Sequence, residues 1–221
     1  MDKIQEIYKK LYTEFGPQGW WPITPENEFH PKHNGIIPKT AKQRFEIIIG
    51  AILTQNTSWK NVEKAIFNLN KAKLVDIDKI KKINLKKLAS LIKPSGYYNQ
   101  KADRLKIIAE FFSKNNSPKR EQLLQVKGIG PETADSILLY AFQNPYFVID
   151  AYTKRIFSRI GICKKDVKYE DLQSVFHKNL SKDTKIFNEY HALIVELAKQ
   201  FCTKQPKCDN CPINSSCKKF I

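Results

Sequence analysis

The stretch Leu123–Tyr140, LLQVKGIGPETADSILLY, decides how the rest of the chain is interpreted. Gly128 and Gly130 flank one aliphatic residue at its centre, and glycine lets a backbone turn tightly and approach a ligand with no Cβ in the way. Pro131 follows at a position typical of a first helical turn. A helix start presents free N–H groups and a positive dipole end, which suit a phosphate. On this stretch alone, an ordinary helical hairpin explains the pattern better than a phosphate site.

A single carboxylate follows about twenty residues downstream. The apolar run Phe147-Val148-Ile149 leads directly into Asp150, and a helix is predicted over Ala151–Ile160. Asp150 suits the N-cap of that helix. It also suits catalysis, and the two roles are compatible because a cap would hold the carboxylate ionised and fixed.

Four of the five cysteines lie in the last 20 residues, spaced Cys202-x5-Cys208-x2-Cys211-x5-Cys217. In a reducing cytosol this crowding favours a metal over disulfides. Four thiolates suit a zinc ion and equally suit a 4Fe–4S cluster. Cys163 stands apart and is interpreted as a buried or incidental thiol.

The composition is strongly basic, with 38 Lys plus Arg against 22 Asp plus Glu, a net charge of +16 and a pI near 9.6. Such a chain usually binds a polyanion, and nucleic acid is the first candidate. A generally lysine-rich proteome is the alternative source of the excess. We find no signal peptide and no apolar run long enough for a membrane span, so we expect a cytoplasmic protein.

Apolar residues recur at helical spacing along most of the chain, and no segment has the alternation of a strand. We therefore expect an all-α protein. The helices are predicted over Ile4–Phe15, Arg44–Leu53, Trp59–Leu69, two short helices within Lys71–Ile92, then Lys101–Phe112, Ala151–Ile160, Tyr169–Leu180 and Ile186–Phe201. Thr57 or Ser58 could cap the third of these.

Taken together, the hairpin LLQVKGIGPETA, the aspartate of VID and the four-cysteine loop resemble the endonuclease III superfamily of helix-hairpin-helix base-excision DNA glycosylases. The resemblance covers about Trp20 to Cys217. It implies two helical lobes, with a six-helix barrel lobe over 36–144 and a discontinuous lobe over 1–35 plus 145–221. It also implies a 4Fe–4S cluster on the cysteine loop, although the first cysteine spacing is one residue shorter than usual in the family.

The resemblance further implies residues that bind DNA. Asp150 would be the catalytic carboxylate. Gln55 would fill the hole that the extruded base leaves in the duplex, whereas the sequence alone also allows a polar helix cap. The hairpin residues Lys127, Gly128, Ile129 and Gly130 would contact the DNA backbone. Bifunctional members carry a lysine where this chain has Glu132, so the resemblance implies a monofunctional glycosylase that uses water.

The motifs WWP, LTQNT with the following aromatic, PSGYYNQKA and KGIGPETADSIL most resemble the 3-methyladenine branch of the superfamily. That branch implies a base pocket formed by Trp20, Trp21, Pro22, Trp59, Glu132 and Lys199. In the branch the lysine is carbamylated. From its own segment, the tryptophan pair is better explained as a hydrophobic plug under a loop, whereas Lys199 is explained about equally well as a pocket residue and as one more surface lysine of a basic chain.

A carboxylate and tryptophan faces would both favour a cationic alkylated purine. The alternatives are a mismatch glycosylase for adenine, uracil or thymine, and a non-catalytic DNA-binding helix-hairpin-helix module. We expect a monomer that acts on double-stranded DNA containing a damaged base.

Overall fold

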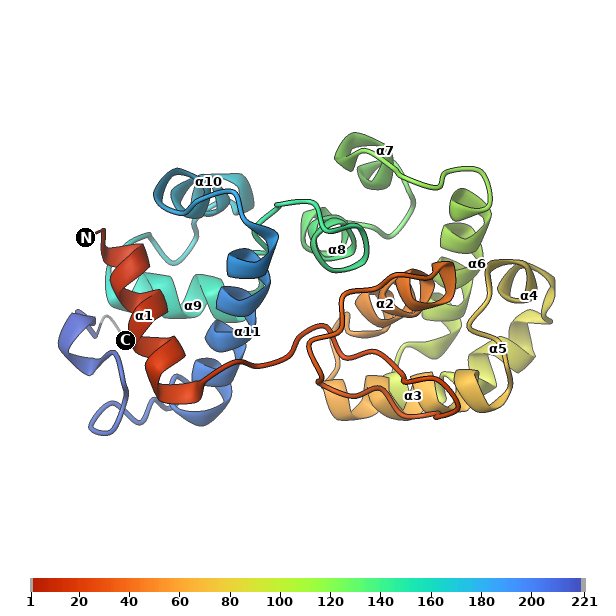
Figure 1. The fold of residues 1–221 in the computed structure, drawn as a ribbon, viewed down its shortest axis with the longest axis horizontal. Coiled ribbons are helices and arrows are strands. Elements are labelled where there is room, and N and C mark those ends of the chain that lie inside the picture. The colour runs from red at the N-terminus through yellow and green to blue at the C-terminus, as the bar shows by residue number, and fades with distance from the viewer. Residues whose placement is uncertain (1, 220–221) are drawn as a thin grey trace. The chain divides into compact units, whose positions relative to one another are not determined.

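The computed structural model describes residues 2–219. Within that range, helices form all the regular structure apart from one isolated antiparallel bridge between Ile23 and Lys32. The prediction of an all-α protein is confirmed for these residues. The elements, coloured along the chain in Figure 1, are α1 (Lys3–Phe15), α2 (Ala41–Leu53), α3 (Trp59–Lys71), α4 (Ile77–Lys82), α5 (Leu85–Leu91), η1 (Lys93–Ser95), α6 (Tyr98–Phe112), α7 (Arg120–Leu124), α8 (Pro131–Ser136), the π-helical turn η2 (Ile137–Ala141), α9 (Ala151–Ile160), α10 (Tyr169–Asn179), α11 (Thr184–Gln200) and η3 (Asn214–Ser216).

The chain divides into two compact units, which we describe separately. The continuous unit contains residues 21–143, and the discontinuous unit contains residues 1–20 and 144–221. The division expected from the sequence, 36–144 against 1–35 plus 145–221, differs from these units chiefly in residues 21–35.

Residues 21–35 belong to the continuous unit because a buried polar cluster anchors them there. The backbone N–H of Thr24 donates to Glu46 Oε1 at 2.7 Å, and Asn70 Nδ2 donates to Glu46 Oε2 at 3.1 Å. Glu46 lies on α2 and Asn70 on α3. Burial raises the pKa of Glu46, although these hydrogen bonds act in the opposite direction. Trp21, at the start of this segment, is 6% exposed and is also buried in the continuous unit.

The core of the continuous unit is built around α2. The helix begins at a capping box, in which Thr40 and Gln43 exchange side-chain and backbone hydrogen bonds. Every residue from Phe45 to Leu53 is buried. Helices α3 and α6 and the turn η2 pack against it. A Cβ on Gly50 would lie 3.2 Å from the Trp21 ring, so the glycine permits the tryptophan to pack closely.

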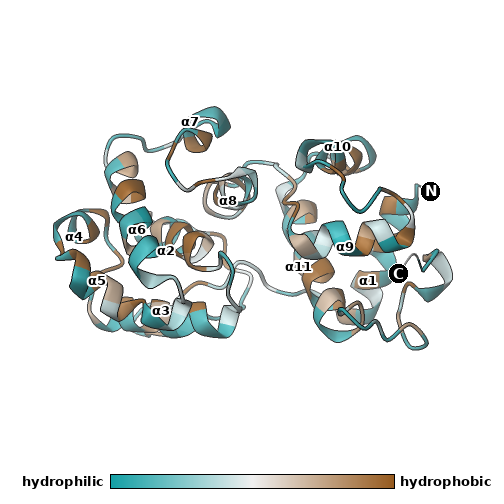
Figure 2. Ribbon diagram, turned by 180° about the vertical axis from the view of Figure 1, so that it is seen from behind, coloured by the Kyte–Doolittle hydropathy of each residue, from teal (hydrophilic) through white to brown (hydrophobic). Residues whose placement is uncertain are grey.

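The discontinuous unit joins the two ends of the chain in one core. Helix α1 buries Ile4, Ile7 and Leu11 and packs against α11. The hydroxyl of Tyr190 donates to the carbonyl of Ile4 at 2.9 Å. Figure 2 colours the residues by hydropathy, so the hydrophobic and hydrophilic parts of the helices in each unit can be followed. The aromatic core consists of Phe147, Phe157, Phe176, Phe187 and Tyr190.

Two local expectations need correction. Ser58 occupies the N-cap of α3, but its side chain makes no capping hydrogen bond, and Thr57 Oγ1 instead accepts from Asn61 Nδ2 at 3.1 Å. Helix α6 begins at Tyr98 rather than at Lys101, following Tyr97 in the left-handed conformation at φ 45°.

Candidate nucleic-acid interface and base pocket

The two hairpin glycines have different structural roles. Gly128 has φ 86°, and a Cβ there would lie 2.6 Å from Arg104 Nε. The fold therefore requires glycine at 128. Gly130 has φ −94° and ψ 178°, its Cβ would meet no atom within 4 Å, and it is exposed. Nothing within the chain's own fold demands glycine at 130.

The Gln55 side chain is bonded to the hairpin. Its Nε2 donates to the carbonyl of Gly128 at 3.2 Å and to Thr133 Oγ1 at 3.0 Å. Its Oε1 accepts a hydrogen bond from Arg104 Nη1. The alternative of a simple helix cap therefore does not describe the observed bonding, since Gln55 bridges α6 and the hairpin.

A buried ion pair joins the helices on either side of the hairpin. Arg120 Nε lies 2.6 Å from Asp135 Oδ1, and Arg120 Nη2 lies 3.1 Å from Asp135 Oδ2. Asp135 is fully buried on α8. Lys127 projects as an exposed side chain, whereas Ile129 is buried. The turn is thus held by the buried Ile129 side chain, and the ion pair joins the helices that flank it.

Two predicted pocket residues meet in the continuous unit, and a third follows one of them in the chain. The rings of Trp21 and Trp59 lie 5.3 Å apart with an interplanar angle of 89°, so the edge of one indole meets the face of the other. Trp21 also packs on Tyr140 at 4.9 Å. Pro22 is buried beside it in the chain. Trp21 is 6% exposed and packed among aromatic rings, as a hydrophobic plug would be, and its role in a base pocket stays a prediction. The indole N–H of Trp59 is buried and finds no hydrogen-bond acceptor among the described residues.

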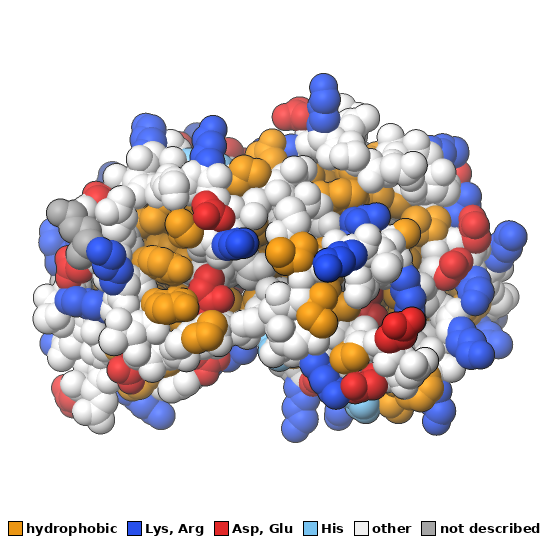
Figure 3. Space-filling model, in the orientation of Figure 1, with side chains coloured by type: hydrophobic (Ala, Val, Ile, Leu, Met, Phe, Trp, Pro, Cys, Tyr) orange, Lys and Arg blue, Asp and Glu red, His pale blue; other side chains and the backbone are white. Residues whose placement is uncertain are grey.

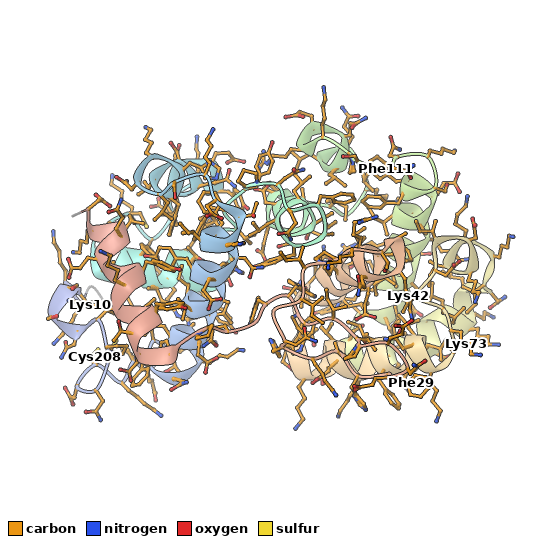
Figure 4. All side chains as sticks on the ribbon, in the orientation of Figure 1. Lys10, Phe29, Lys42, Lys73, Phe111 and Cys208 are labelled. Atoms are coloured by element: carbon orange, nitrogen blue, oxygen red, sulfur yellow. The ribbon has the colours of Figure 1, made fainter. Side chains whose placement is uncertain are left out.

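Glu132 lies in the first turn of α8 and is exposed. Its backbone carbonyl accepts from Ser136 Oγ at 2.7 Å. A surface cavity of about 520 Å³ also opens in this unit beside Phe29, Lys42 and Lys73, which Figure 4 labels, but its lining includes none of the predicted pocket residues.

In the discontinuous unit, Asp150 caps α9 as its sequence position indicated. Its Oδ1 accepts from the backbone N–H of Thr153 and from Thr153 Oγ1, both at 2.7 Å. Its Oδ2 lies 3.7 Å from His191 Nε2. Burial by itself raises the pKa of Asp150, but the His191 ring and the bonds from Thr153 outweigh it, so the pKa lies below its ordinary value.

His191 is a residue that the sequence analysis missed. It is buried on α11, and its ring meets the half-buried Trp20 edge-to-face at 5.8 Å. The signal that could have found it is the histidine within the otherwise apolar run HALIV. Lys199 lies near the end of the same helix and is exposed. Trp20, Asp150 and His191 are thus brought together, while Lys199 shares their unit.

The four C-terminal cysteines line one cavity together with apolar side chains of α9 and the loop. Cys208 lies in this loop, as labelled in Figure 4. All four are free, half-buried thiols. Burial raises the pKa of the Cys211 thiol, and the neighbouring thiols act in the same direction. Among residues 2–219, no three His, Cys, Asp or Glu side chains are arranged as ligands of a metal ion.

Two arginines of α9 hold this loop. Arg155 Nε and Nη2 donate to the carbonyl of Cys202 at 3.0 and 2.7 Å. Arg159 Nη1 contacts Cys202 Sγ at 3.3 Å and donates to the carbonyl of Thr203 at 2.7 Å. Cys163 is half-buried apart from this group, and burial raises its pKa.

Residues 49–182 match the family described as "HhH-GPD superfamily base excision DNA repair protein". The chain belongs to this superfamily. The prediction of the endonuclease III superfamily is thereby confirmed. None of the helices in the described part of the chain is long and apolar enough to cross a membrane.

Relatives agree with this assignment over nearly the whole chain. The chain is 45% identical to the "Putative DNA repair glycosylase MJ1434" of Methanocaldococcus jannaschii, covering 98% of this chain and 96% of that one. It is 29% identical to endonuclease III of Sulfolobus acidocaldarius, with 100% and 98% covered.

Solved structures show the same fold. The H. pylori 3-methyladenine DNA glycosylase MagIII bound to 1,N6-ethenoadenine matches with a TM-score of 0.70 and 29% identity, covering 90% of this chain and 98% of that one. A non-covalent complex of endonuclease III with DNA matches with a TM-score of 0.80 and 20% identity, covering 99% and 96%. At that identity the second likeness concerns the fold alone.

Proposed function

We propose that this protein is a monofunctional DNA glycosylase that excises alkylated purines, such as 3-methyladenine, by hydrolysis of the N-glycosidic bond. Membership of the superfamily places it among base-excision DNA glycosylases, and the chain's own residues suggest the finer assignment. The observation that carries the proposal is Asp150, a carboxylate whose position is fixed by Thr153 and whose pKa lies below its ordinary value.

Asp150 suits the chemistry of base excision. The damaged base must first leave the helical stack. As the N-glycosidic bond breaks, the sugar becomes cation-like, and an ionised carboxylate nearby stabilises that charge and can orient the attacking water. Asp150 Oδ1 is engaged by Thr153, whereas Oδ2 faces His191 at 3.7 Å. One oxygen is therefore held by Thr153, and the other lies beside the His191 ring.

Glu132 supports the monofunctional assignment. It occupies the position, two residues after Gly130, where bifunctional members carry the attacking lysine. A carboxylate cannot form a Schiff base with the abasic sugar. Water is then the nucleophile, and the abasic product remains uncleaved.

The proposed substrate class follows from the charge of the lesion. Alkylated purines such as 3-methyladenine carry positive charge, which an indole face attracts. The half-buried Trp59 would offer that face, with the buried Trp21 packed against it. The Glu132 carboxylate adds a Coulombic term that solvent weakens, since Glu132 is exposed. The likeness to the H. pylori enzyme at 29% identity supports the same class. Pro22 would pack beside the tryptophans of the continuous unit, whereas Trp20 and Lys199 belong to the discontinuous unit.

We propose that double-stranded DNA binds at the hairpin formed by Lys127, Gly128, Ile129 and Gly130. The open space at Gly130 would let a phosphate approach the backbone N–H groups. Lysine and arginine side chains spread over the face of each unit in Figure 3, in keeping with the net charge of +16. Tyr97, at 69% exposure, offers an aromatic ring that could stack on a base.

We further propose that Cys202, Cys208, Cys211 and Cys217 hold a 4Fe–4S cluster. The four thiols are chemically suited to such a cluster and line one cavity whose other walls are largely apolar, although among residues 2–219 they are not arranged as ligands. The cluster would fix the C-terminal loop, and no step of the hydrolysis requires it. Purified protein should be brown and contain iron and acid-labile sulfide. Colourless protein with stoichiometric zinc would replace this assignment with a zinc site.

The decisive experiment is an excision assay in which the released bases are identified by mass. DNA treated with a methylating agent should release 3-methyladenine, and the strand should stay intact until alkali is added. Borohydride should trap no covalent complex. Glu132→Gln should lower the release of the cationic base by about fivefold at most, as expected for a solvent-exposed charge.

The mismatch alternative gives the opposite pattern in the same assay. Efficient release of uracil or thymine, or of adenine opposite 8-oxoguanine, without release of 3-methyladenine would overturn the proposed substrate class. Tight duplex binding with no released base of any kind would instead indicate a non-catalytic DNA-binding module.

A further inference from the structure

Lys101 is a buried cation whose ammonium group joins two loops. It is 1% exposed on α6. Its Nζ donates to the carbonyl of Leu53 at 2.8 Å and to the carbonyl of Ser95 at 2.7 Å. Leu53 is the last residue of α2, two residues before Gln55, and Ser95 lies in the turn that leads to Tyr97. The ammonium group thus ties the end of α2 to the turn before α6.

Arg104 joins the same helix to the hairpin. Its Nη1 donates to Gln55 Oε1, and its side chain fills the space in which a Cβ of residue 128 would lie, 2.9 Å from Arg104 Cδ. Gln55 in turn donates to the carbonyl of Gly128 and to Thr133 Oγ1. The guanidinium group therefore holds Gln55 in the orientation in which its amide binds the hairpin.

Residues three apart on a helix share one face, so Lys101 and Arg104 act from the same side of α6. We propose that they are positioning residues that fix three segments, 53–55, 95–97 and 127–130, as one preorganised surface for the backbone of duplex DNA. This inference rests on the proposed function for the identity of the ligand. A surface ordered in advance loses less conformational entropy on binding, which raises affinity without adding a contact.

The test uses Arg104→Met, because removing Lys101 could prevent folding. Methionine retains an unbranched side chain against Gly128 and removes the guanidinium group. Lys106→Met is the matched control. Lys106 lies on the same helix, and its Nζ donates to the carbonyls of Lys81 and Ile83, so this variant also loses one positive charge and carbonyl contacts. It does not disturb the three segments.

Two measurements separate positioning from general stability. Amide hydrogen exchange of the DNA-free protein should accelerate at 54–57 and 127–130 in Arg104→Met and not in Lys106→Met. Affinity for an undamaged duplex should fall about tenfold in Arg104→Met, the effect of losing one charge-assisted hydrogen bond. The single-turnover excision rate at saturating enzyme should stay near that of the wild type, and Arg104→Lys should recover part of the affinity.

A double variant tests whether Arg104 acts through Gln55. If it does, the double variant Gln55→Ala, Arg104→Met should have about the same duplex affinity as the single variant that binds DNA less tightly, because the effects of coupled residues are not additive. Equal effects of Arg104→Met and Lys106→Met on exchange and affinity would overturn the inference. If wild-type protein binds no duplex, the proposed function fails, and the exchange measurement still decides whether the three segments are coupled.

Discussion

At the scale of single residues, Asp150 combines two roles that one substitution can separate. Asparagine is as good an N-cap as aspartate. Asp150→Asn should therefore keep α9 capped and remove only the negative charge. Because that charge acts on the transition state, we expect excision to fall by at least about a hundredfold while binding of a lesion-containing duplex changes little.

The measurement is single-turnover excision, alongside equilibrium binding and thermal unfolding of the same variant. Asp150→Ala is the control for capping, and it should lose about 1 kcal/mol of stability as well as activity. Near-normal turnover by Asp150→Asn would reduce Asp150 to a helix cap.

The hairpin glycines give a second contrast. Gly128→Ala would place a Cβ against Arg104 and force a side chain into φ 86°, so we expect a clear drop in melting temperature. Gly130→Ala meets open space at an ordinary backbone conformation, so its melting temperature should match that of the wild type.

Duplex affinity should depend on Gly130, although the melting temperature does not. If the hairpin amides bind phosphate, the methyl group at 130 should weaken duplex affinity in a protein that is fully folded. The comparison requires thermal melts and binding isotherms on both variants. A Gly130→Ala protein with unchanged affinity would exclude close approach of the DNA backbone at that residue.

At the scale of elements, Lys101 on α6 should make the free energy of unfolding depend on pH in the alkaline range. Burial, followed by the nearby charge of Arg104, lowers the pKa of Lys101 from 10.5 to about 8. Between these two values the unfolded chain binds the proton more tightly than the folded one, so this group's contribution to stability rises with pH. That contribution is complete above about 10.5 and is lost as the pH falls through about 8.

We therefore expect the denaturant midpoint of the wild type to rise relative to that of Lys101→Met as the pH is raised from neutral towards 10.5. The comparison cancels the other groups that titrate in this range. If Lys101→Met does not fold, Lys101→Arg, which stays charged throughout, gives the same comparison. A constant difference across this range would show that Lys101 titrates normally.

Local sequence predicted the elements well where the signals themselves are local. Gly128, Pro131 and the capping aspartate Asp150 each mark an end of a helix within a few residues of it. Local sequence did not predict the role of Glu46, a carboxylate within an apolar helix. Its burial is explained by the hydrogen bonds that it accepts from Thr24 and Asn70, both remote in sequence.

The candidate site was predictable to the same extent. Gln55 and Asp150 could be named from motifs. The run HALIV marks His191 but not its role, and no motif marks Arg104, because both roles arise from contacts across 41 and 49 residues with Asp150 and Gln55. Nor does any local pattern give the perpendicular contact of Trp21 with Trp59. Side-chain orientation is set by packing of the whole unit, which periodicity does not encode.

At the scale of the whole molecule, the charge of +16 should make DNA binding strongly salt-dependent. Each phosphate contact releases counterions, so the logarithm of affinity should fall linearly with the logarithm of salt concentration. Lys127→Gln should reduce that slope by about one, because Lys127 lies in the hairpin. Lys87→Gln on α5 removes the same charge and should change the slope less. A slope near zero for the wild type would contradict binding to a polyanion.

The discontinuous unit has a consequence for how the protein emerges from the ribosome. Helix α1 is made long before its partner α11, which begins only at Thr184. At about 5–20 residues per second, the apolar stripe of Ile4, Ile7 and Leu11 must wait for roughly ten seconds or longer while the continuous unit is synthesised. During that interval the nascent chain exposes the apolar side of α1, which is the kind of surface that chaperones bind. The discontinuous unit can therefore assemble its core only after α11 has been made.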